Sequence, residues 1–218
     1  MARTKSTYLA LLTLLAFGNS AVAGLIVYDD RALFEADNAG LANEDFENAN
    51  LASGTATAFA GTLNSLTNNS IFAAGSVIDG FSLVPEVGFV YVGNDFGGVP
   101  TVGVSSDSFA ADINILFDPD VTAVGLDLFG FADNFVVTWT VTFNDNVTIG
   151  STIVTTPGFF GVFTSSGMIS SLFLDKPDSG GVIDNLTFGT PTVVPEPGTL
   201  ALLGIGLFGM GLARRKKI

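Results

Sequence analysis

Residues 135–143 read Phe-Val-Val-Thr-Trp-Thr-Val-Thr-Phe, with an apolar side chain at every second position from Phe135 to Phe143 and threonine at positions 138, 140 and 142. Successive side chains of a β-strand point to opposite faces of the sheet, so this alternation is typical of a strand with one buried face. It is the clearest period-two run in the chain. It predicts a β-strand fold with Trp139 in the core.

Shorter apolar runs lie on both sides of this strand, separated by turn residues such as Asp118-Pro119-Asp120 and Asn144-Asp145-Asn146. About ten short strands with frequent turns favour an antiparallel, jelly-roll-like β-sandwich. One short helix is expected after Asp29 or Asp30, with Leu33 and Phe34 facing inward. Residues 49–76 have the weakest periodicity and are expected to hold long loops. The expected strands cover residues 25–28, 77–84, 88–92, 113–117, 121–129, 135–143, 147–154, 159–163, 168–174 and 182–188.

The N-terminus is typical of a secretory signal peptide. Arg3 and Lys5 form a positively charged region, residues 9–17 are apolar, and Ala21-Val22-Ala23 is a small-residue cleavage site. Residues 1–23 are therefore expected to be a signal peptide that signal peptidase removes after Ala23. The apolar run is too short for an ordinary membrane-spanning helix.

The C-terminus carries a second targeting pattern. Pro195-Glu196-Pro197-Gly198 precedes the uncharged apolar stretch 199–213, and Arg214-Arg215-Lys216-Lys217 follows it. A helix over 199–213 would span roughly 22 Å of the ~30 Å hydrocarbon core, and the flanking cations can reach the headgroups. Such cations stay on the cytoplasmic side, so the preceding domain is expected across the membrane.

This ordered combination in residues 195–218 closely resembles the PEP-CTERM sorting signal of Gram-negative bacteria, a tail that is also labelled as the C-terminal domain of ice-binding proteins. The resemblance implies that exosortase, a membrane transpeptidase, acts near residues 195–198. It also implies that the body is released or transferred to the cell envelope, cell surface or extracellular matrix.

The region between the two signals has the length of one domain, expected at residues 24–189 with a linker at 190–194. The body up to residue 197 carries all 21 acidic residues and only Arg31 and Lys176 as basic ones, which leaves it at about −19. Such a charge repels nucleic acid, so nucleic-acid binding is not expected. The chain has no Cys and no His, which rules out disulfides, thiol nucleophiles and imidazole bases within it.

An early Asp45-Phe46-Glu47 and a late Val182-Ile183-Asp184-Asn185-Leu186 resemble motifs of jelly-roll carbohydrate-binding and galactose-binding-like modules. In these folds an acidic residue of the first strand and an Asp of the last strand often share a structural calcium. The resemblance implies Glu47 and Asp184 as calcium ligands, with Asp45 as a further candidate. Hard carboxylate oxygens suit calcium. The alternative is that Asp184 caps a turn and Glu47 is solvated.

Aromatic, threonine and carboxylate side chains are further candidates for binding or catalysis. Tyr91 and Phe96, beside a Gly-rich loop, are the best candidates for sugar contact, because Trp139 is expected in the core. The threonine row 138–142 is more typical of an ordinary solvated strand face than of an ice-binding array. Paired carboxylates can hydrolyse glycosides, but nothing in the sequence singles out a pair, and no catalytic residues are expected.

These observations predict an exported, non-enzymatic, acidic β-sandwich that exosortase sorts and that has a structural or interaction role. The alternative is a glycan-binding surface protein. The expected partners are signal peptidase, exosortase, the cytoplasmic membrane and, in the final location, extracellular polysaccharide. No cofactor follows firmly from the sequence, and a structural calcium is the one candidate.

Overall fold

The computed structural model describes residues 24–192 except 87, 107–111, 131–134, 144–145, 155–156 and 176–180. The predicted signal peptide 1–23 and the predicted sorting tail 195–218 lie outside these residues, as do Ala21 and Ala23 of the expected cleavage site. The described residues therefore belong to the body between the two predicted targeting segments.

Thirteen strands and one short helix form the described part of the body. In chain order these are β1 (Leu25–Tyr28), α1 (Arg31–Asp37), β2 (Ala42–Glu44), β3 (Thr55–Ala60), β4 (Phe81–Pro85), β5 (Phe89–Asn94), β6 (Val102–Ser106), β7 (Ile113–Val121), β8 (Ala123–Gly130), β9 (Phe135–Phe143), β10 (Asn146–Val154), β11 (Gly158–Thr164), β12 (Ile169–Asp175) and β13 (Gly181–Gly189).

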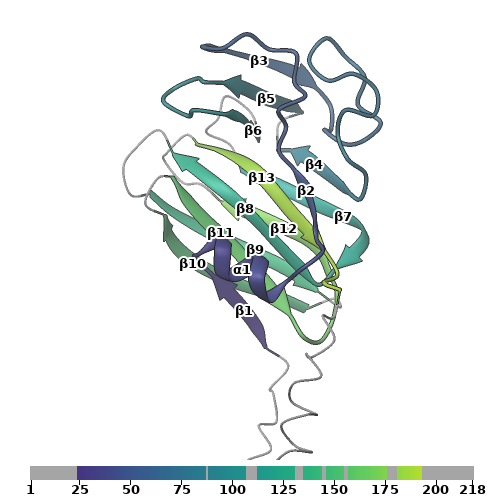
Figure 1. Ribbon diagram of the computed structural model, residues 1–218, viewed down its shortest axis with the longest axis vertical. Helices are drawn as coiled ribbons and strands as arrows, with labels where there is room; N and C mark the ends of the chain where they lie inside the picture. The colour runs from purple at the N-terminus through teal and green to yellow at the C-terminus, as the bar shows by residue number, and fades with distance from the viewer. Residues whose placement is uncertain are drawn as a thin grey trace, which may run out of the picture.

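The strands form two antiparallel sheets (Figure 1). The larger has the order β1-β11-β8-β13-β6-β5-β3, with β2 paired to β13, and the smaller has the order β10-β9-β12-β7-β4. Side chains from both sheets share one buried hydrophobic cluster. These pairings confirm the expected mainly β, antiparallel body, while its jelly-roll likeness stays a prediction.

The period-two run at residues 135–143 is β9, and its Val137, Trp139 and Val141 side chains are buried in the core. Trp139 is 6% exposed, and its ring lies 5.5 Å from that of Phe160 on the other sheet. Gly150 of β10 is paired with Trp139 of β9, and a Cβ atom at Gly150 would overlap the indole. The prediction that Trp139 belongs to the core is confirmed.

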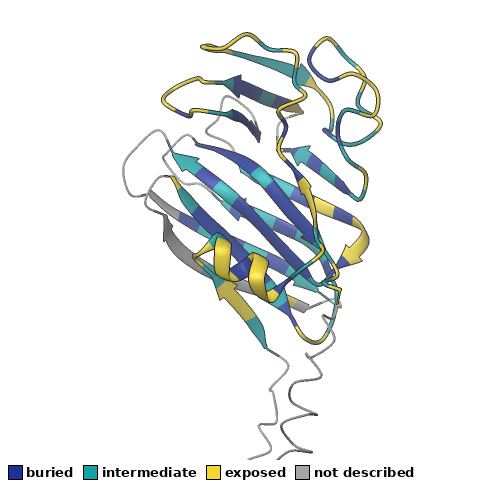
Figure 2. Ribbon diagram, in the orientation of Figure 1, coloured by how far each residue is buried: buried dark blue, intermediate teal, exposed yellow. Residues whose placement is uncertain are grey.

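Helix α1 lies on the outer face of the larger sheet. Asp30 caps it, since its carboxylate accepts a hydrogen bond from Leu33 N at 2.9 Å. Phe34 is fully buried over Gly125 and Gly161, where Cβ atoms would collide with aromatic rings. Leu33 is 61% exposed, so the expectation that it faces inward was wrong. Neighbouring helix positions point about 100° apart, and the sheet covers only the Phe34 side (Figure 2).

Three strands were not expected, and one is longer than expected. β2, β3 and β6 are short or rich in Ala, Gly and Ser, so their sequences lack a period-two signal. β3 lies inside the stretch that was expected to hold loops. β7 continues through Asp118-Pro119-Asp120 to Val121, although these residues were expected to end the strand. In all four cases, pairing with strands that are distant in sequence determines where the strand forms, and a local sequence pattern carries no information about such pairing.

Candidate calcium site and sorting signal

A tight turn after β2 brings the early acidic motif beside the last strand. β2 pairs with β13 in the register Glu44 to Leu186. The Glu44 carboxylate is 2% exposed and accepts hydrogen bonds from Phe46 N at 2.9 Å and Ile78 N at 2.7 Å. Phe46 adopts a φ of 55° and is fully buried in the core. The hydrogen bonds of Glu44 and the burial of Phe46 therefore hold this turn in place directly before Glu47.

Glu47 and Asp184 meet at one hydroxyl group. Thr101 Oγ1 lies 2.5 Å from Glu47 Oε1 and 2.9 Å from Asp184 Oδ2. Glu47 Oε1 also accepts a hydrogen bond from Val102 N at 3.1 Å. A hydroxyl carries one proton, so it can donate to only one of the two carboxylates at a time. At any moment one of the two carboxylates therefore receives no proton from the Thr101 hydroxyl.

Asp184 is the more buried of the two carboxylates, with 2% of its surface exposed. Burial raises the pKa of Asp184 to about 7, and the nearby charges of Asp127 and Glu47 add to the rise. Hydrogen bonds from Asn185 N, at 2.6 Å, and from Thr101 lower this pKa in part. Near neutral pH the group is thus poised between its two protonation states.

Arg31, the one Lys or Arg that the structure describes, pairs with a different carboxylate. Its Nε donates to Asp127 Oδ1 at 2.9 Å, and its Nη2 donates to Asn185 O at 2.9 Å. Asn185 has a φ of 48° at a bulge in β13, and its Nδ2 donates to Asp127 Oδ2 at 2.9 Å. Asp127 is therefore compensated by a cation, whereas Glu47 and Asp184 have none among the described residues.

The structure brings together two of the three predicted calcium ligands. Asp45 is exposed, and its carboxylate accepts a hydrogen bond from Glu47 N at 3.1 Å rather than joining Thr101. Within the described ranges, no group of three or more His, Cys, Asp or Glu side chains is arranged to hold a metal ion. Glu47, Asp184 and Thr101 supply hard oxygens, and calcium would need water to complete its six to eight ligands. The calcium site stays a prediction.

Sequence reasoning missed Thr101, Asn185, Asp127 and Arg31. The one local signal was Asn185 directly after Asp184, because Asn tolerates positive φ better than most residues. The others lie far away in sequence, and only sheet pairing brings them into the site.

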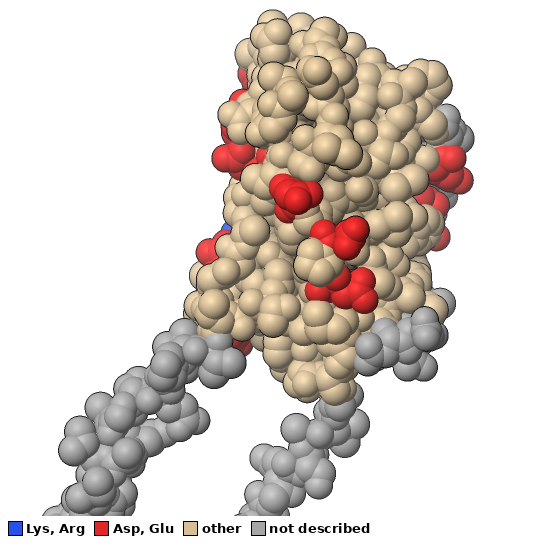
Figure 3. Space-filling model, turned by 90° about the vertical axis from the view of Figure 1, so that its right-hand side faces the viewer, with Lys and Arg blue, Asp and Glu red and all other residues tan. Residues whose placement is uncertain are grey.

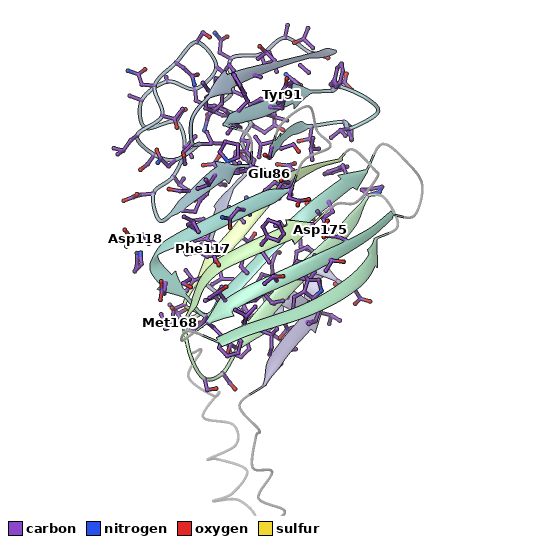
Figure 4. All side chains as sticks on the ribbon, turned by 180° about the vertical axis from the view of Figure 1, so that it is seen from behind. Glu86, Tyr91, Phe117, Asp118, Met168 and Asp175 are labelled. Carbon is purple, nitrogen blue, oxygen red and sulfur yellow. The ribbon has the colours of Figure 1, made fainter. Side chains whose placement is uncertain are left out.

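A second acidic group lies at one end of the smaller sheet. Burial raises the pKa of Asp175, and the charges of Asp112 and Glu86 raise it further. Glu86 and Asp175 lie near each other there (Figure 4). Asp112 N donates to Glu86 Oε2 at 3.4 Å, so the Glu86 carboxylate already accepts a local hydrogen bond.

The two candidate sugar-contact residues, Tyr91 and Phe96, differ in exposure, and their role in sugar binding stays a prediction. Phe96 is 38% exposed, whereas Tyr91 is half-buried against the small apolar cluster of Val99 and Val182. Instead, a pocket of about 350 Å³ lies elsewhere on the larger sheet, lined by Asp127, Phe129, Pro157, Gly158 and Phe159.

The comparison with protein families concerns the tail. Residues 193–217 match the PEP-CTERM protein-sorting motif. The match contains all of the predicted signal residues, from Pro195-Glu196-Pro197-Gly198 to Arg214-Arg215-Lys216-Lys217. This PEP-CTERM tail marks the chain as an exported protein that is anchored in the membrane until exosortase processes it.

A search of curated proteins and a search of solved structures each found no match to the chain. In the part of the chain that the structure describes, no helix is long and apolar enough to cross a membrane. The predicted span 199–213 lies outside that part.

Proposed function

We propose that this chain is a non-catalytic cargo of exosortase, delivered to the cell surface or extracellular polysaccharide matrix of a Gram-negative bacterium for a structural or interaction role. The observation that carries the proposal is the PEP-CTERM motif at residues 193–217, which begins four residues after β13 ends. A folded β body followed so closely by a sorting signal is the arrangement of a cargo domain.

The two ends of the body support this arrangement because they leave from one end of the domain (Figure 1). Leu25 pairs with Thr164, Thr164 N donates to Thr122 O at 2.9 Å, and Thr122 N donates to Gly189 O at 3.0 Å. Both targeting segments therefore attach at this end, and the rest of the surface is left to face away from the membrane.

The state of the buried carboxylates supports a non-catalytic role. Glu44 and Asp184 are the buried acids among the described residues, and each accepts hydrogen bonds from backbone N–H groups. Neither lines the pocket of Asp127, Phe129, Pro157, Gly158 and Phe159. Both therefore act as local structural anchors in this proposal.

The charge of the body supports an interaction with cations and matrix polymers. Figure 3 shows acidic side chains in several patches and almost no basic surface. Divalent cations bind such a surface and can bridge it to acidic polysaccharide. Calcium at Glu47 and Asp184 would add rigidity to the turn that follows β2, beside β13.

The test uses the full chain in a bacterium that has exosortase. Replacing Pro195, Glu196 and Pro197 together by Ala should leave the protein as an unprocessed membrane-bound form, whereas the wild type is converted to a shorter product. A pulse-chase followed by membrane fractionation measures this. Processing of the triple variant at the wild-type rate would refute the sorting role.

Glycan binding is the second candidate, and the pocket beside β8 and β11 favours it. Phe129 and Phe159 provide aromatic walls and Asp127 provides a polar group, which is the combination that sugar sites use. A glycan array with the wild type and Phe129→Ala tests this role. Binding that is lost in the variant would support it, and no binding to any glycan would count against it.

A further inference from the structure

A groove of about 850 Å³ lies at the end of the domain from which the chain continues to the sorting motif. The C-terminal end of α1, the end of β11 and residues 190–192 form its walls. Phe163 gives it an apolar surface, Thr122 and Ser165 add hydroxyl groups, and Asp37 is the only charged residue among those that line it. In a body of about −19, this is a surface of low charge.

The wall formed by residues 190–192 is fixed to the domain. Thr192 N donates to Ala39 O at 3.1 Å, and Thr192 Oγ1 lies 3.2 Å from the same oxygen. Gly40 has a φ of 81°, and a Cβ atom there would lie 2.6 Å from Thr192 Oγ1. Three of the five residues of the expected 190–194 linker are therefore part of the folded surface.

This attachment limits how far the sorting motif can move from the groove. Pro195 is three residues beyond Thr192, so an extended chain places it at most about 11 Å away, and Gly198 at most about 22 Å. Exosortase has to reach residues 195–198 to act on them. Its exported face must then come within about 22 Å of the end of the domain that carries the groove.

We propose that the groove lined by α1, β11 and residues 190–192 is a docking site for exosortase, which inserts an apolar side chain of an exported loop against Phe163. This rests on the proposed function and extends it, since the folded body and not only the tail would contribute to recognition. The low charge of the groove favours this contact, because no carboxylate other than Asp37 has to be desolvated.

The test fills the groove in the full-length chain and measures the rate of processing by pulse-chase. Ser165→Trp places a large side chain at an exposed lining position. Ala74→Trp makes the same kind of change at an exposed loop position outside the groove and serves as the matched control. Ser165→Trp should be processed about tenfold more slowly, which corresponds to about 1.4 kcal/mol of docking energy, and Ala74→Trp should match the wild type. Limited proteolysis of both precursors checks that the body stays folded.

A flexible insertion separates docking from simple obstruction. Eight Gly and Ser residues between Thr192 and Val193 let the enzyme reach the motif without approaching the groove. If the groove is a docking site, the insertion alone slows processing and does not rescue Ser165→Trp. Rescue by the insertion, or wild-type processing of Ser165→Trp, would overturn the proposal.

A photoreactive residue at position 165 gives an independent readout. Ser165→benzoylphenylalanine should cross-link to exosortase in membranes. Cross-links only to lipid or to a second copy of the chain would overturn the docking proposal. Failure of the wild type itself to be processed would instead refute the proposed function.

Discussion

Removal of the Arg31 side chain should destabilise the body, because this residue connects α1 to the larger sheet by several contacts. It connects α1 to the larger sheet through Asp127, through Asn185 O and through Thr187 Oγ1, to which Nη1 donates at 3.0 Å. Its guanidinium also lies 4.8 Å from the centre of the Phe159 ring. Arg31→Ala removes these contacts together and leaves the Asp127 carboxylate without its cation.

The expected loss follows from these contacts. A hydrogen bond to a charged group contributes about 1.5–3 kcal/mol and a cation–π contact about 0.5–1 kcal/mol. The side chains of Arg31 and Asp127 are 24% and 22% exposed, so water recovers part of this. We expect Arg31→Ala to lower the free energy of unfolding by about 3 kcal/mol, which is a fall in Tm of about 6–12 °C for a domain of this size.

Thermal unfolding followed by circular dichroism of the purified protein measures this at pH 7. Glu35→Ala is the matched control, because Glu35 pairs with Arg31 at 3.1 Å but is 54% exposed. That exposed pair should contribute only about 0.3–0.5 kcal/mol. Arg31→Lys should lie between the two, since it keeps the charge but not the planar fork. The reasoning is refuted if Arg31→Ala and Glu35→Ala lower Tm equally.

Three further predictions concern the calcium site and the core. Burial raises the pKa of Asp184 from its ordinary value of 3.8 to about 7 in the folded state. Between these two pH values the folded state binds more protons than the unfolded state, so stability falls as pH rises. With a chelator present, Tm should therefore fall less from pH 5 to pH 8 in Asp184→Asn than in the wild type. An equal fall in the two proteins would contradict this. Calcium should raise Tm at pH 8 in the wild type but not in Glu47→Gln, and a wild-type Tm that chelation leaves unchanged would count against the site. Gly150→Ala should lower the free energy of unfolding by about 1–3 kcal/mol, because the added methyl group overlaps Trp139. The loss should be smaller when Trp139→Phe is also present. Equal losses in the two backgrounds, measured by chemical denaturation, would argue against the overlap.

The core of the fold could be predicted from the sequence where one face of a strand is buried. The alternation at residues 135–143 identified β9 and placed Trp139 inside, because burial of one face dictates the period of two. β2 and β6 gave no such signal, since they are short and owe their strand conformation to β13 beside them. Leu33 and Phe34 are both apolar, and only the position of α1 on the sheet shows which one is buried.

The candidate site could be predicted in part. Glu47 and Asp184 were named from their places near the start and end of the body, and the β2–β13 pairing brings both to Thr101. The ion pair between Arg31 and Asp127 could not be inferred, because 96 residues separate them and no local pattern connects them. The sorting signal, in contrast, is a continuous stretch whose order of residues carries the information, so the sequence alone was enough to find it.

The central claim is that exosortase processes this chain at its PEP-CTERM tail. The most direct measurement is the intact mass of the protein recovered from a host with exosortase and from the same host lacking it. The account predicts a product that ends near residues 195–198 in the first strain, and a membrane-bound chain that still carries residues 199–218 in the second. A chain that keeps residues 199–218 and has the same distribution in both strains would contradict it.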